Sequence, residues 1–600
     1  MGDDILHYYE RELSFIREMG GEFARKYPKI AGRLLLDGEK CDDPHTERLI
    51  EAFALLCGRV HKKIDDDFPE VTESFFQILY PHYTCPIPSM SVVTFDPVKT
   101  AIPPSGYCIP TETPLYSRQV NGMQCQFKTR YPVTLWPVEV ISASLKDPRR
   151  TLPNAQQSLV ITIKTTGGVG MSQLEWHSLR FFLNGQSQHV LPMYELIFNN
   201  ATSVEFVGQN QKGAPVELKQ SGDAIRPVGF SPEEAMLPTT GKSFPGYLLL
   251  TEYFCFPEKF LFFDVAGLEK LSTLDLQDTL EIWINFDCPA KLGLTVSGEI
   301  FALNAAPIVN LFSRTAEPVQ ISHEKTAYPV IPDVRRQDAT EIFSIDRVSS
   351  LPMAKGGEKE YRPYYSLSHH RAGTEDTEGN VYWHMRRLPS GRYGDEGTDL
   401  TMSFAGLDFS TAFPEAEILM VQTTCTNRDL PGRMRFGDST GDFETEIAAP
   451  VTSIRCLVKP TRTRRPALDG SLQWRLISHL ALNYTSIVSG GEDALKEILK
   501  MYDFDNSPST RQQISGITSL KTSYVTKRIG RSFCRGVQVE MTLDEEKFVG
   551  SALYLFSGII ERFIGQYVSV NSFSQLVVKT LQRKETFRIW PPRNGDRVLL

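Results

Sequence analysis

The sequence has 600 residues, of which 41% are hydrophobic and 23% charged, and its formal net charge is −8. This composition is ordinary for a soluble globular protein, and the length predicts about three or four domains. The mild acidity argues against nucleic acid as the main partner. The acidic start predicts no signal peptide, and no apolar run is long enough for a membrane-spanning helix. Ten cysteines without a CxxC motif predict reduced thiols in a cytoplasm.

The first predicted element is an amphipathic helix that ends before Pro28. Its apolar residues recur in alternating steps of three and four, at Leu6, Tyr9, Leu13, Ile16, Gly20, Phe23 and Tyr27. This heptad spacing is what two helices need in order to pack along their length. A second apolar row consists of Ile5, Tyr8, Phe15 and Met19. A face this wide buries more than one neighbour. The spacing leaves open whether these neighbours belong to this chain or to a partner. The candidate partner-interface residues in such a helical bundle are Leu6, Tyr9, Leu13, Phe15, Ile16, Met19 and Phe23.

Two further helices are expected before residue 88. Asp43 as N-cap and Pro44 at the first helical position predict the start of the second helix. Its apolar face consists of Leu49, Ile50, Phe53, Leu56, Cys57, Val60 and Ile64. A third helix is expected between Pro69 and Pro81, with acidic residues 65–67 ahead of its N-terminus, where negative charge is favourable. The prolines of Pro86-Ile87-Pro88 then predict a linker.

From residue 89 the pattern changes to short runs of period two, which predict strands. The expected strands are Met90–Phe95, Gln126–Lys128, Val133–Trp136, Leu159–Lys164, Leu179–Leu183, Tyr194–Phe198, Ser203–Val207, Tyr247–Phe254, Phe260–Val265, Leu280–Phe286, Asp399–Phe404 and Ile418–Thr424. After Pro460 the chain is mixed. The expected elements there are helices at Leu472–Ser489, Ala494–Tyr502 and Gly550–Gln566, and strands at Val537–Leu543 and from Tyr567 onward.

The predicted fold class is multidomain α+β. We expect an N-terminal helical bundle segment at residues 1–88 and a β-rich domain at 89–305. A second β-rich domain with long polar loops is expected at 306–455, and an α+β C-terminal domain with a strand–helix–strand core at 456–600.

The strongest enzyme motif is Gly437-Asp438-Ser439-Thr440-Gly441, a match to GxSxG. That motif holds a nucleophile only where a buried strand leads into it and a helix leads out of it. Neither flank has that pattern here, so a surface turn is expected. The alternative is a cytoplasmic hydrolase that uses Ser439 with a histidine such as His479.

Three other clusters are weaker candidates. His369, His370 and His384 surround Glu375, Asp376 and Glu378, but lack zinc-finger or HExxH spacing, so a polar loop is expected. The glycines of 167–170 lack the rest of a dinucleotide fingerprint and predict a hairpin or bulge. The densest basic patch consists of Lys459, Arg462, Arg464 and Arg465. A solvated linker is expected there, ahead of a site for an acidic protein. We expect no catalytic residue, metal or cofactor, which indicates a structural or adaptor protein.

A series of residue blocks follows in order along almost the whole chain. The blocks are Tyr8-Tyr9, Glu12-Leu13, Phe23-Ala24, Tyr27-Pro28, Asp43–Leu49, Asp65–Glu70, Tyr80–Tyr83, Pro86–Met90, Cys125–Thr129, Tyr131-Pro132, Leu135–Pro137, Cys425–Pro431, Trp474–Tyr484 and Val568–Phe573. Together they resemble the TssF family, also called VasA or ImpG, the baseplate subunits of bacterial type VI secretion systems. One departure is Glu112, at a position where the family often has glycine.

The resemblance implies a cytoplasmic, non-enzymatic scaffold similar to the wedge proteins of contractile phage tail baseplates. It implies an N-terminal helical bundle shared with TssG and with a second TssF copy. Such wedges carry TssK and TssE, surround the VgrG spike, initiate sheath assembly and transmit contraction. The resemblance also implies a baseplate that docks at the inner-membrane secretion complex, with no nucleic acid partner and no insertion into the membrane.

Overall fold

The structure is a computed structural model, and it divides into two compact units. One consists of Met1–Gln77 with Ala467–Leu480, and the other of Ile78–Pro466 with Ala481–Leu600. The described residues are 9–10, 12–17, 19, 23, 25–31, 36–37, 40–41, 43–66, 76, 80–149, 155–210, 212–239, 245–274, 276–291, 293–322, 325–350, 360–364, 381–405, 418–465, 491–529, 532–568 and 572–595. The predicted helix at Leu472–Ser489 lies outside them.

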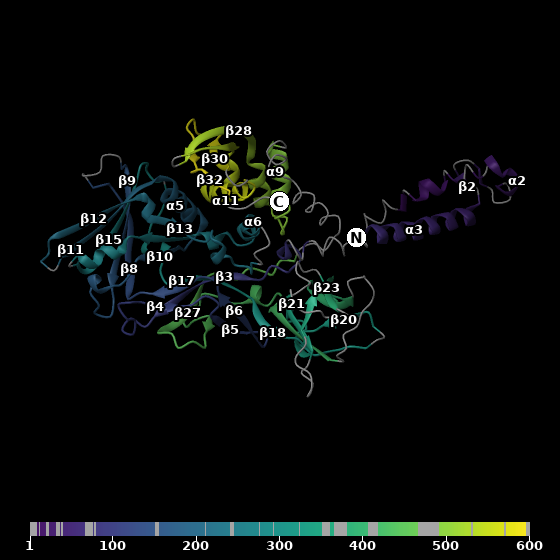
Figure 1. The fold of residues 1–600 in the computed structure, drawn as a ribbon, viewed down its shortest axis with the longest axis horizontal. Helices are drawn as coiled ribbons and strands as arrows, with labels where there is room; N and C mark the ends of the chain where they lie inside the picture. The colour runs from purple at the N-terminus through teal and green to yellow at the C-terminus, as the bar shows by residue number, and fades with distance from the viewer. Residues whose placement is uncertain are drawn as a thin grey trace. The chain divides into compact units, whose positions relative to one another are not determined.

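The first unit contains a helical hairpin. Its leading helix includes the helical residues 9–10, 12–17, 19, 23 and 25–26, and Tyr27 interrupts it before Pro28, as predicted. A short helix α2 (Pro28–Ala31) and the strand pair β1 (Leu36–Asp37) and β2 (Lys40–Cys41) follow. The chain then returns as α3 (Pro44–Asp66), beside the leading helix (Figure 1). Arg17 of the leading helix forms an ion pair with Glu47 of α3.

The start of α3 confirms the predicted cap. The Asp43 carboxylate accepts a hydrogen bond from the backbone N–H of His45 at 3.1 Å and one from the Thr46 hydroxyl at 2.8 Å. These bonds satisfy donors that a helix N-terminus leaves without partners, and they lower the pKa of Asp43. Most of the predicted third helix lies outside the described residues. Phe76 is helical and buried, and Pro81–Tyr83 forms the 3₁₀ helix η1.

The second unit is built around a closed barrel. Its strands, in order, are β17 (Ala305–Val309), β3 (Met90–Pro97), β27 (Val451–Val458), β26 (Phe443–Glu444), β5 (Pro114–Val120) and β6 (Met123–Thr129). Phe95, Phe127 and Ile454 belong to its core. The barrel therefore joins segments that are more than 300 residues apart in sequence. Two of the expected boundaries, after residues 305 and 455, fall inside β17 and β27.

Three smaller antiparallel sheets use strands from residues 107–302. One has the order β12 (Pro215–Ser221), β11 (Ala201–Asn210), β15 (Leu276–Phe286), β9 (Gln157–Thr165) and β8 (Val138–Lys146). Another has the order β13 (Ile225–Pro227), β14 (Phe262–Ala266), β10 (Ser178–Leu183) and β16 (Phe301–Ala302). The third pairs β4 (Tyr107–Ile109) with β7 (Val133–Leu135).

An eight-stranded sheet follows in the sequence. Its order is β18 (Phe312–Thr315), β25 (Ile418–Thr426), β21 (Glu341–Ser350), β22 (Glu360–Pro363), β23 (Tyr382–Pro389), β24 (Thr398–Ala405) and β20 (Ala327–Val330), and β19 (Val319–Gln320) also pairs with β25. Its buried face includes Tyr328, Val348, Trp383, Met402 and Val421.

The C-terminal sheet confirms the predicted strand–helix–strand core. Its strands are β28 (Ile517–Ile529), β29 (Ser532–Leu543), β30 (Ser572–Thr580), β31 (Arg588–Ile589) and β32 (Arg593–Asn594). The parallel pair β29 and β30 is connected through α11 (Leu553–Gly565). α9 (Gly491–Lys500) and α10 (Pro508–Ser515) precede β28. The strand after α11 begins at Ser572, later than the predicted Tyr567.

Two predicted strands are wrong. Tyr194–Phe198 lies in α5 (Ser187–Asn200), and Tyr247–Phe254 lies in α6 (Pro245–Cys255). Both helices contact α11, and α6 is buried around almost its whole circumference. Because α6 is apolar on all sides, it has no clear period, and its sequence cannot be told from that of a buried strand. In α5 the buried Val190, Met193 and Ile197 follow helical spacing, but this spacing extends beyond the predicted strand.

The predicted linker at Pro86–Pro88 is also wrong. All three residues are buried, and Ile87 exchanges two backbone hydrogen bonds with Arg464, at 2.7 and 3.0 Å. The segment is therefore part of the folded second unit. The mixed α+β architecture is confirmed. Nine cysteines are free thiols in the structure: Cys57, Cys85, Cys108, Cys125, Cys255, Cys288, Cys425, Cys456 and Cys534.

The structure shows how glutamate is accommodated at position 112, where the TssF family often has glycine. Its backbone has a φ of 64°, which lies in the left-handed region that glycine adopts most easily. The Glu112 carboxylate forms ion pairs with Lys128, at 2.5 Å, and with Arg130. These contacts hold a non-glycine residue in a strained conformation.

Candidate partner interface

An exposed apolar stripe runs along α3. It consists of Leu49, Phe53, Leu56 and Val60, which are spaced by four, three and four residues. Their side chains are between 49 and 70% exposed. Leu55, beside the stripe, is also exposed, whereas Ala54 is fully buried. An amphipathic helix of a soluble protein normally turns such a stripe toward a core. This stripe therefore marks a surface that fits another helix.

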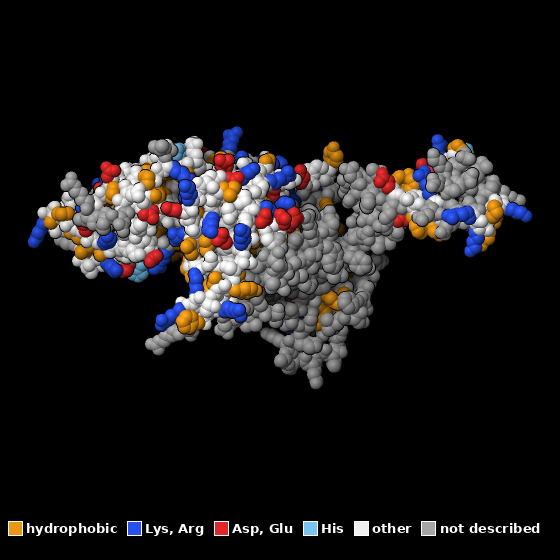
Figure 2. Space-filling view, turned by 90° about the horizontal axis from the view of Figure 1, so that it is seen from above, with side chains coloured by type: hydrophobic (Ala, Val, Ile, Leu, Met, Phe, Trp, Pro, Cys, Tyr) orange, Lys and Arg blue, Asp and Glu red, His pale blue; other side chains and the backbone are white. Residues whose placement is uncertain are grey.

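The leading helix carries a second exposed apolar row. Phe15, Met19 and Phe23 follow at steps of four, so they share one helix face, and all three are exposed. Tyr27 and Ile30 are exposed just beyond them. Orange apolar side chains are visible on the surface of this unit among blue and red ones (Figure 2). The hairpin therefore does not cover its own apolar faces.

The seven predicted interface residues fall into three groups. Phe15, Met19 and Phe23 are exposed, whereas Tyr9, Leu13 and Ile16 are half-buried. Leu6 lies outside the described residues. The half-buried residues lie on the part of the helix that also holds the Arg17–Glu47 pair. The structure thus separates residues within the hairpin from residues that face outward, a distinction that spacing alone did not give.

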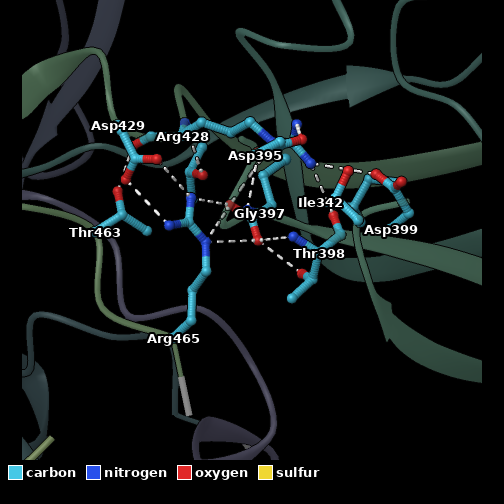
Figure 3. A network of polar contacts seen from close by, with 12 residues as sticks. Ile342, Asp395, Gly397, Thr398, Asp399, Arg428, Asp429, Thr463 and Arg465 are labelled. Atoms are coloured by element: carbon cyan, nitrogen blue, oxygen red, sulfur yellow. Dashed lines mark hydrogen bonds and ion pairs between the residues drawn. The ribbon is translucent and has the colours of Figure 1, made fainter. Parts of the chain in front are cut away.

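A buried network of charges lies in the second unit (Figure 3). Arg428, only 2% exposed, donates to Asp395 at 2.5 Å, to Asp399 at 3.2 Å and to the carbonyl of Gln337 at 2.9 Å. Arg465 donates to the buried Glu341 at 2.8 Å and to Asp429 at 3.1 Å. The network joins β21, the turn after β25, the loop 395–399 and the segment after β27.

This network corrects the prediction of a solvated basic linker. Lys459 and Arg462 are exposed, as expected. Arg464 and Arg465 instead have protein partners: Arg464 donates to Asp505 and to the carbonyl of Cys255, both at 2.7 Å. Burial by itself would lower the pKa of Arg465, but the hydrogen bonds and charges of Glu341 and Asp429 raise it above its ordinary value.

The block Cys425–Pro431 is a junction between the barrel and the eight-stranded sheet. Asn427 accepts hydrogen bonds from the Gln126 N–H of β6 and from the Asn310 side chain, both at 2.8 Å. Its own N–H donates to Asn310 at 2.7 Å. Arg428 has a φ of 50°, which turns its side chain into the charge network. The sequence marked this block only through the family resemblance.

The candidate nucleophile Ser439 lies in an exposed turn before β26. Gly437 and Gly441 on either side have φ values of 81° and 102°. The Asp442 carboxylate accepts the N–H groups of Gly437 and Cys456, both at 2.8 Å. A 3₁₀ helix precedes this turn and a two-residue strand follows it, so it lacks the strand–turn–helix geometry of a nucleophile elbow. The partner His479 lies outside the described residues.

The remaining candidates are the glycines of 167–170 and the histidine cluster. Gly167 and Gly168 form a left-handed turn after β9, but the turn is not the predicted hairpin or bulge, because the next strand, β10, belongs to another sheet. His384 lies on β23, whereas the rest of its cluster falls outside the described residues. Within the residues that the structure describes, no group of three or more His, Cys, Asp or Glu side chains could hold a metal ion.

A groove of about 690 Å³ lies in the second unit, lined by both apolar and charged side chains. Tyr253, Phe436 and Leu555 contribute apolar surface, and Arg464 and Asp505 contribute charge. These two charged side chains form an ion pair at 2.7 Å. Their charges are therefore largely neutralised, and neither points to a cofactor.

His82, from the block Tyr80–Tyr83, predicts a pH effect on stability. It is buried, and within the described part of the chain neither ring nitrogen has a hydrogen-bond partner. Burial lowers its pKa to about 4. The unfolded chain therefore binds a proton near pH 6.5 that the folded chain excludes. The free energy of unfolding is expected to be highest above pH 6.5 and to fall as the pH drops toward 4.

The measurement is urea unfolding of the wild type and of His82→Phe at pH 7.5 and at pH 5. The variant is expected to lose about 2 kcal/mol less than the wild type on acidification. His45→Phe, at an exposed position of α3, is the matched control and should follow the wild type. Equal losses in all three proteins would show that His82 does not titrate in this way.

The comparisons with known proteins agree in one family. The sequence profile described as "Type VI secretion system, TssF" matches residues 1–597. The chain belongs to the TssF family. It is 34% identical over 627 residues to "Type VI secretion system component TssF1" of Pseudomonas aeruginosa, and the match covers 100% of each chain.

Two solved structures share the fold of this TssF-family chain. One is a chain of the type VI secretion system TssK-TssF-TssG baseplate subcomplex, determined by cryo-electron microscopy. The two chains superpose with a TM-score of 0.74 at 26% identity, over 92% of this chain and 99% of the other. The second is a chain of the baseplate complex from the type VI secretion system, with a TM-score of 0.59 at 25% identity, over 99% and 100% of the chains. No described helix is long and apolar enough to cross a membrane.

Proposed function

We propose that this chain is a structural subunit of a type VI secretion baseplate. We further propose that its helical hairpin packs against helices of partner subunits. The observation that carries the proposal is the exposed heptad stripe of Leu49, Phe53, Leu56 and Val60. The similarity along the whole chain to proteins of TssK-TssF-TssG assemblies supports it. A large apolar surface of this kind is typical of an obligate interface.

The proposed partners of the hairpin are helices of TssG and of a second copy of this chain. TssK is the next component of the wedge. TssE, the VgrG spike and docking at the inner-membrane secretion complex from the cytoplasm complete the proposed assembly. In this role the β-rich second unit acts as a rigid arm that transmits force, because the charge network and the Asn427 junction tie its sheets together.

Co-expression of the tagged chain with a TssG-family protein from the same secretion system tests the proposal. The two proteins are expected to elute together in affinity and size-exclusion chromatography, and the chain alone is expected to be poorly soluble. Recovery of a soluble monomer that does not bind TssG would contradict the proposal.

Ser439→Ala separates this function from the hydrolase alternative. Because Ser439 lies in an exposed turn outside a nucleophile elbow, we expect the variant to assemble with TssG and to support secretion at the wild-type level. The readouts are co-purification and release of a secreted marker protein from cells. Loss of secretion with assembly intact would favour a catalytic role for Ser439.

A further inference from the structure

The hairpin β28–β29 extends past the sheet to which it belongs. β28 is 13 residues long and is the edge strand, since the sheet order begins β28-β29-β30. β30 pairs with β29 only from Arg535 to Leu543, so the tip of the hairpin has no strand beside it on that side. In Figure 1 β28 lies at the rim of the C-terminal sheet. One long edge of backbone donors and acceptors therefore lacks a neighbouring strand among the described elements.

The hairpin carries only basic charge up to Val539, and its one acidic residue, Glu540, lies at the root opposite Lys521. Between residues 517 and 539 the sequence has five basic residues and no acidic one, in a chain whose net charge is −8. The basic residues are Lys521, Lys527, Arg528, Arg531 and Arg535. Such a segment attracts an acidic partner and repels a basic one.

Two large aromatic side chains stand on one face of the tip. Tyr524 is paired in register with Val537, and Arg528 with Phe533. Alternation along the strands places Tyr524, Arg528, Phe533 and Arg535 on the same face. Tyr524 is 76% exposed and Phe533 is 78% exposed. The Arg535 guanidinium lies 5.9 Å from the centre of the Tyr524 ring.

The same face is a core surface at the root of the hairpin. Leu520, Val539 and Met541 have the same orientation as Tyr524 and are buried. The face that is buried at the root of the hairpin is therefore exposed to solvent at the tip, where it carries aromatic and arginine side chains. If the tip carried basic residues alone, their role could be to prevent the edge strand from pairing with other chains and aggregating. Two exposed aromatic rings work against such protection, and Tyr and Arg are enriched at binding hot spots.

We propose that the β28–β29 tip is a docking site for an acidic, extended segment of another protein, which adds a strand to the edge of β28. The free edge supplies main-chain hydrogen bonds, the arginines meet the acidic side chains, and Tyr524 and Phe533 pack on the apolar ones. A peptide strand uses all three features, whereas nucleic acid or a lipid surface leaves the backbone edge unused. The helical hairpin is not involved, so this proposal stands apart from the proposed assembly with TssG.

The test uses the full chain and a fluorescent 12-residue peptide of three Glu-Thr-Val-Thr repeats, which as a strand presents glutamate and valine in turn on one face. Binding is measured by anisotropy at low salt, with hydrogen exchange of the β28 amides in parallel. We expect the peptide to bind, to slow exchange in β28 and to dissociate as salt is added. R528E with R535E, and separately Y524S with F533S, should each weaken binding about tenfold or more. R118E, at an exposed arginine elsewhere, is the control and should bind as the wild type does.

Three results would overturn the proposal. The first is equal binding of the peptide to wild type and to both double variants. The second is exchange in β28 that the peptide does not slow. The third is tighter binding of a 12-nucleotide thymidine strand, or of phosphatidylglycerol vesicles, than of the peptide. Because the four substituted side chains are exposed, the variants should fold, and far-ultraviolet circular dichroism checks this.

Discussion

Replacing Phe53 and Leu56 with aspartate is expected to abolish the complex with a TssG-family partner. Both side chains lie in the exposed stripe of α3 and do not belong to a hydrophobic core of this chain. In the complex they would be buried, so the change removes two apolar contacts and forces two carboxylates into an apolar interface. The combined cost is about 3 kcal/mol or more, which corresponds to a loss of affinity of roughly a hundredfold.

The measurement is affinity co-purification of the co-expressed proteins, followed by size-exclusion chromatography. Arg48→Asp is the matched control, because it adds a carboxylate to an exposed position of α3 outside the stripe. It should leave the complex intact. Leu13 and Ile16, also predicted interface residues, are less suitable positions because they are half-buried and their replacement would disturb the hairpin itself. A stable complex of the Phe53 and Leu56 double variant would contradict the assignment of the interface.

Replacing Arg428 with methionine is expected to destabilise the second unit strongly. The guanidinium is buried and bonds to Asp395 and Asp399 as well as to the carbonyls of Gln337 and Thr398. Methionine keeps much of the volume but removes all four hydrogen bonds, and Asp395 and Asp399 then retain only Arg392 as a cationic partner among the described residues. Removal of one partner from a fully buried ion pair typically costs about 3–5 kcal/mol. Because Asp399 is half exposed, the cost here is expected at the lower end of that range, about 3 kcal/mol. We therefore expect a clearly lower urea midpoint, or protein that does not stay soluble.

Arg118→Met is the control for this experiment. Arg118 also forms an ion pair, with Asp438 at 2.7 Å, but both side chains are about half exposed. Exposed pairs contribute about 0–1 kcal/mol, so this variant should unfold close to the wild type. Similar midpoints for Arg428→Met and Arg118→Met would show that the buried network contributes little to stability.

The local pattern of the sequence predicted elements well where one face of the element is buried. The capped start of α3, the amphipathic α9 and the alternating strands β24 and β25 lie at or near their expected positions. The failures are α6, whose residues are buried on nearly all sides, and α5, whose helical spacing of buried residues extends beyond the five residues predicted as a strand. Their helical state follows from packing against α11, a partner that lies some 300 residues later in the chain.

The candidate interface was only partly accessible from sequence. Heptad spacing identified the leading helix and the apolar face of α3 as surfaces that pack against helices. It could not distinguish residues turned into the hairpin, such as Leu13 and Ile16, from those that face outward, such as Phe15 and Met19. That distinction depends on how the two helices are rotated against each other.

By itself, the sequence determined the helical start, the β-rich middle, the strand–helix–strand end and the family, because these depend on local periodicity and on ordered residue blocks. Only the tertiary structure decided that the barrel joins β3 to β27, that Arg464 and Arg465 have protein partners, and that Pro86–Pro88 is not a linker. These features depend on contacts between residues far apart in the chain. Local spacing cannot show such contacts, because the same short run of basic residues can form either a buried ion pair or an exposed turn. Which of the two forms depends on residues elsewhere in the chain.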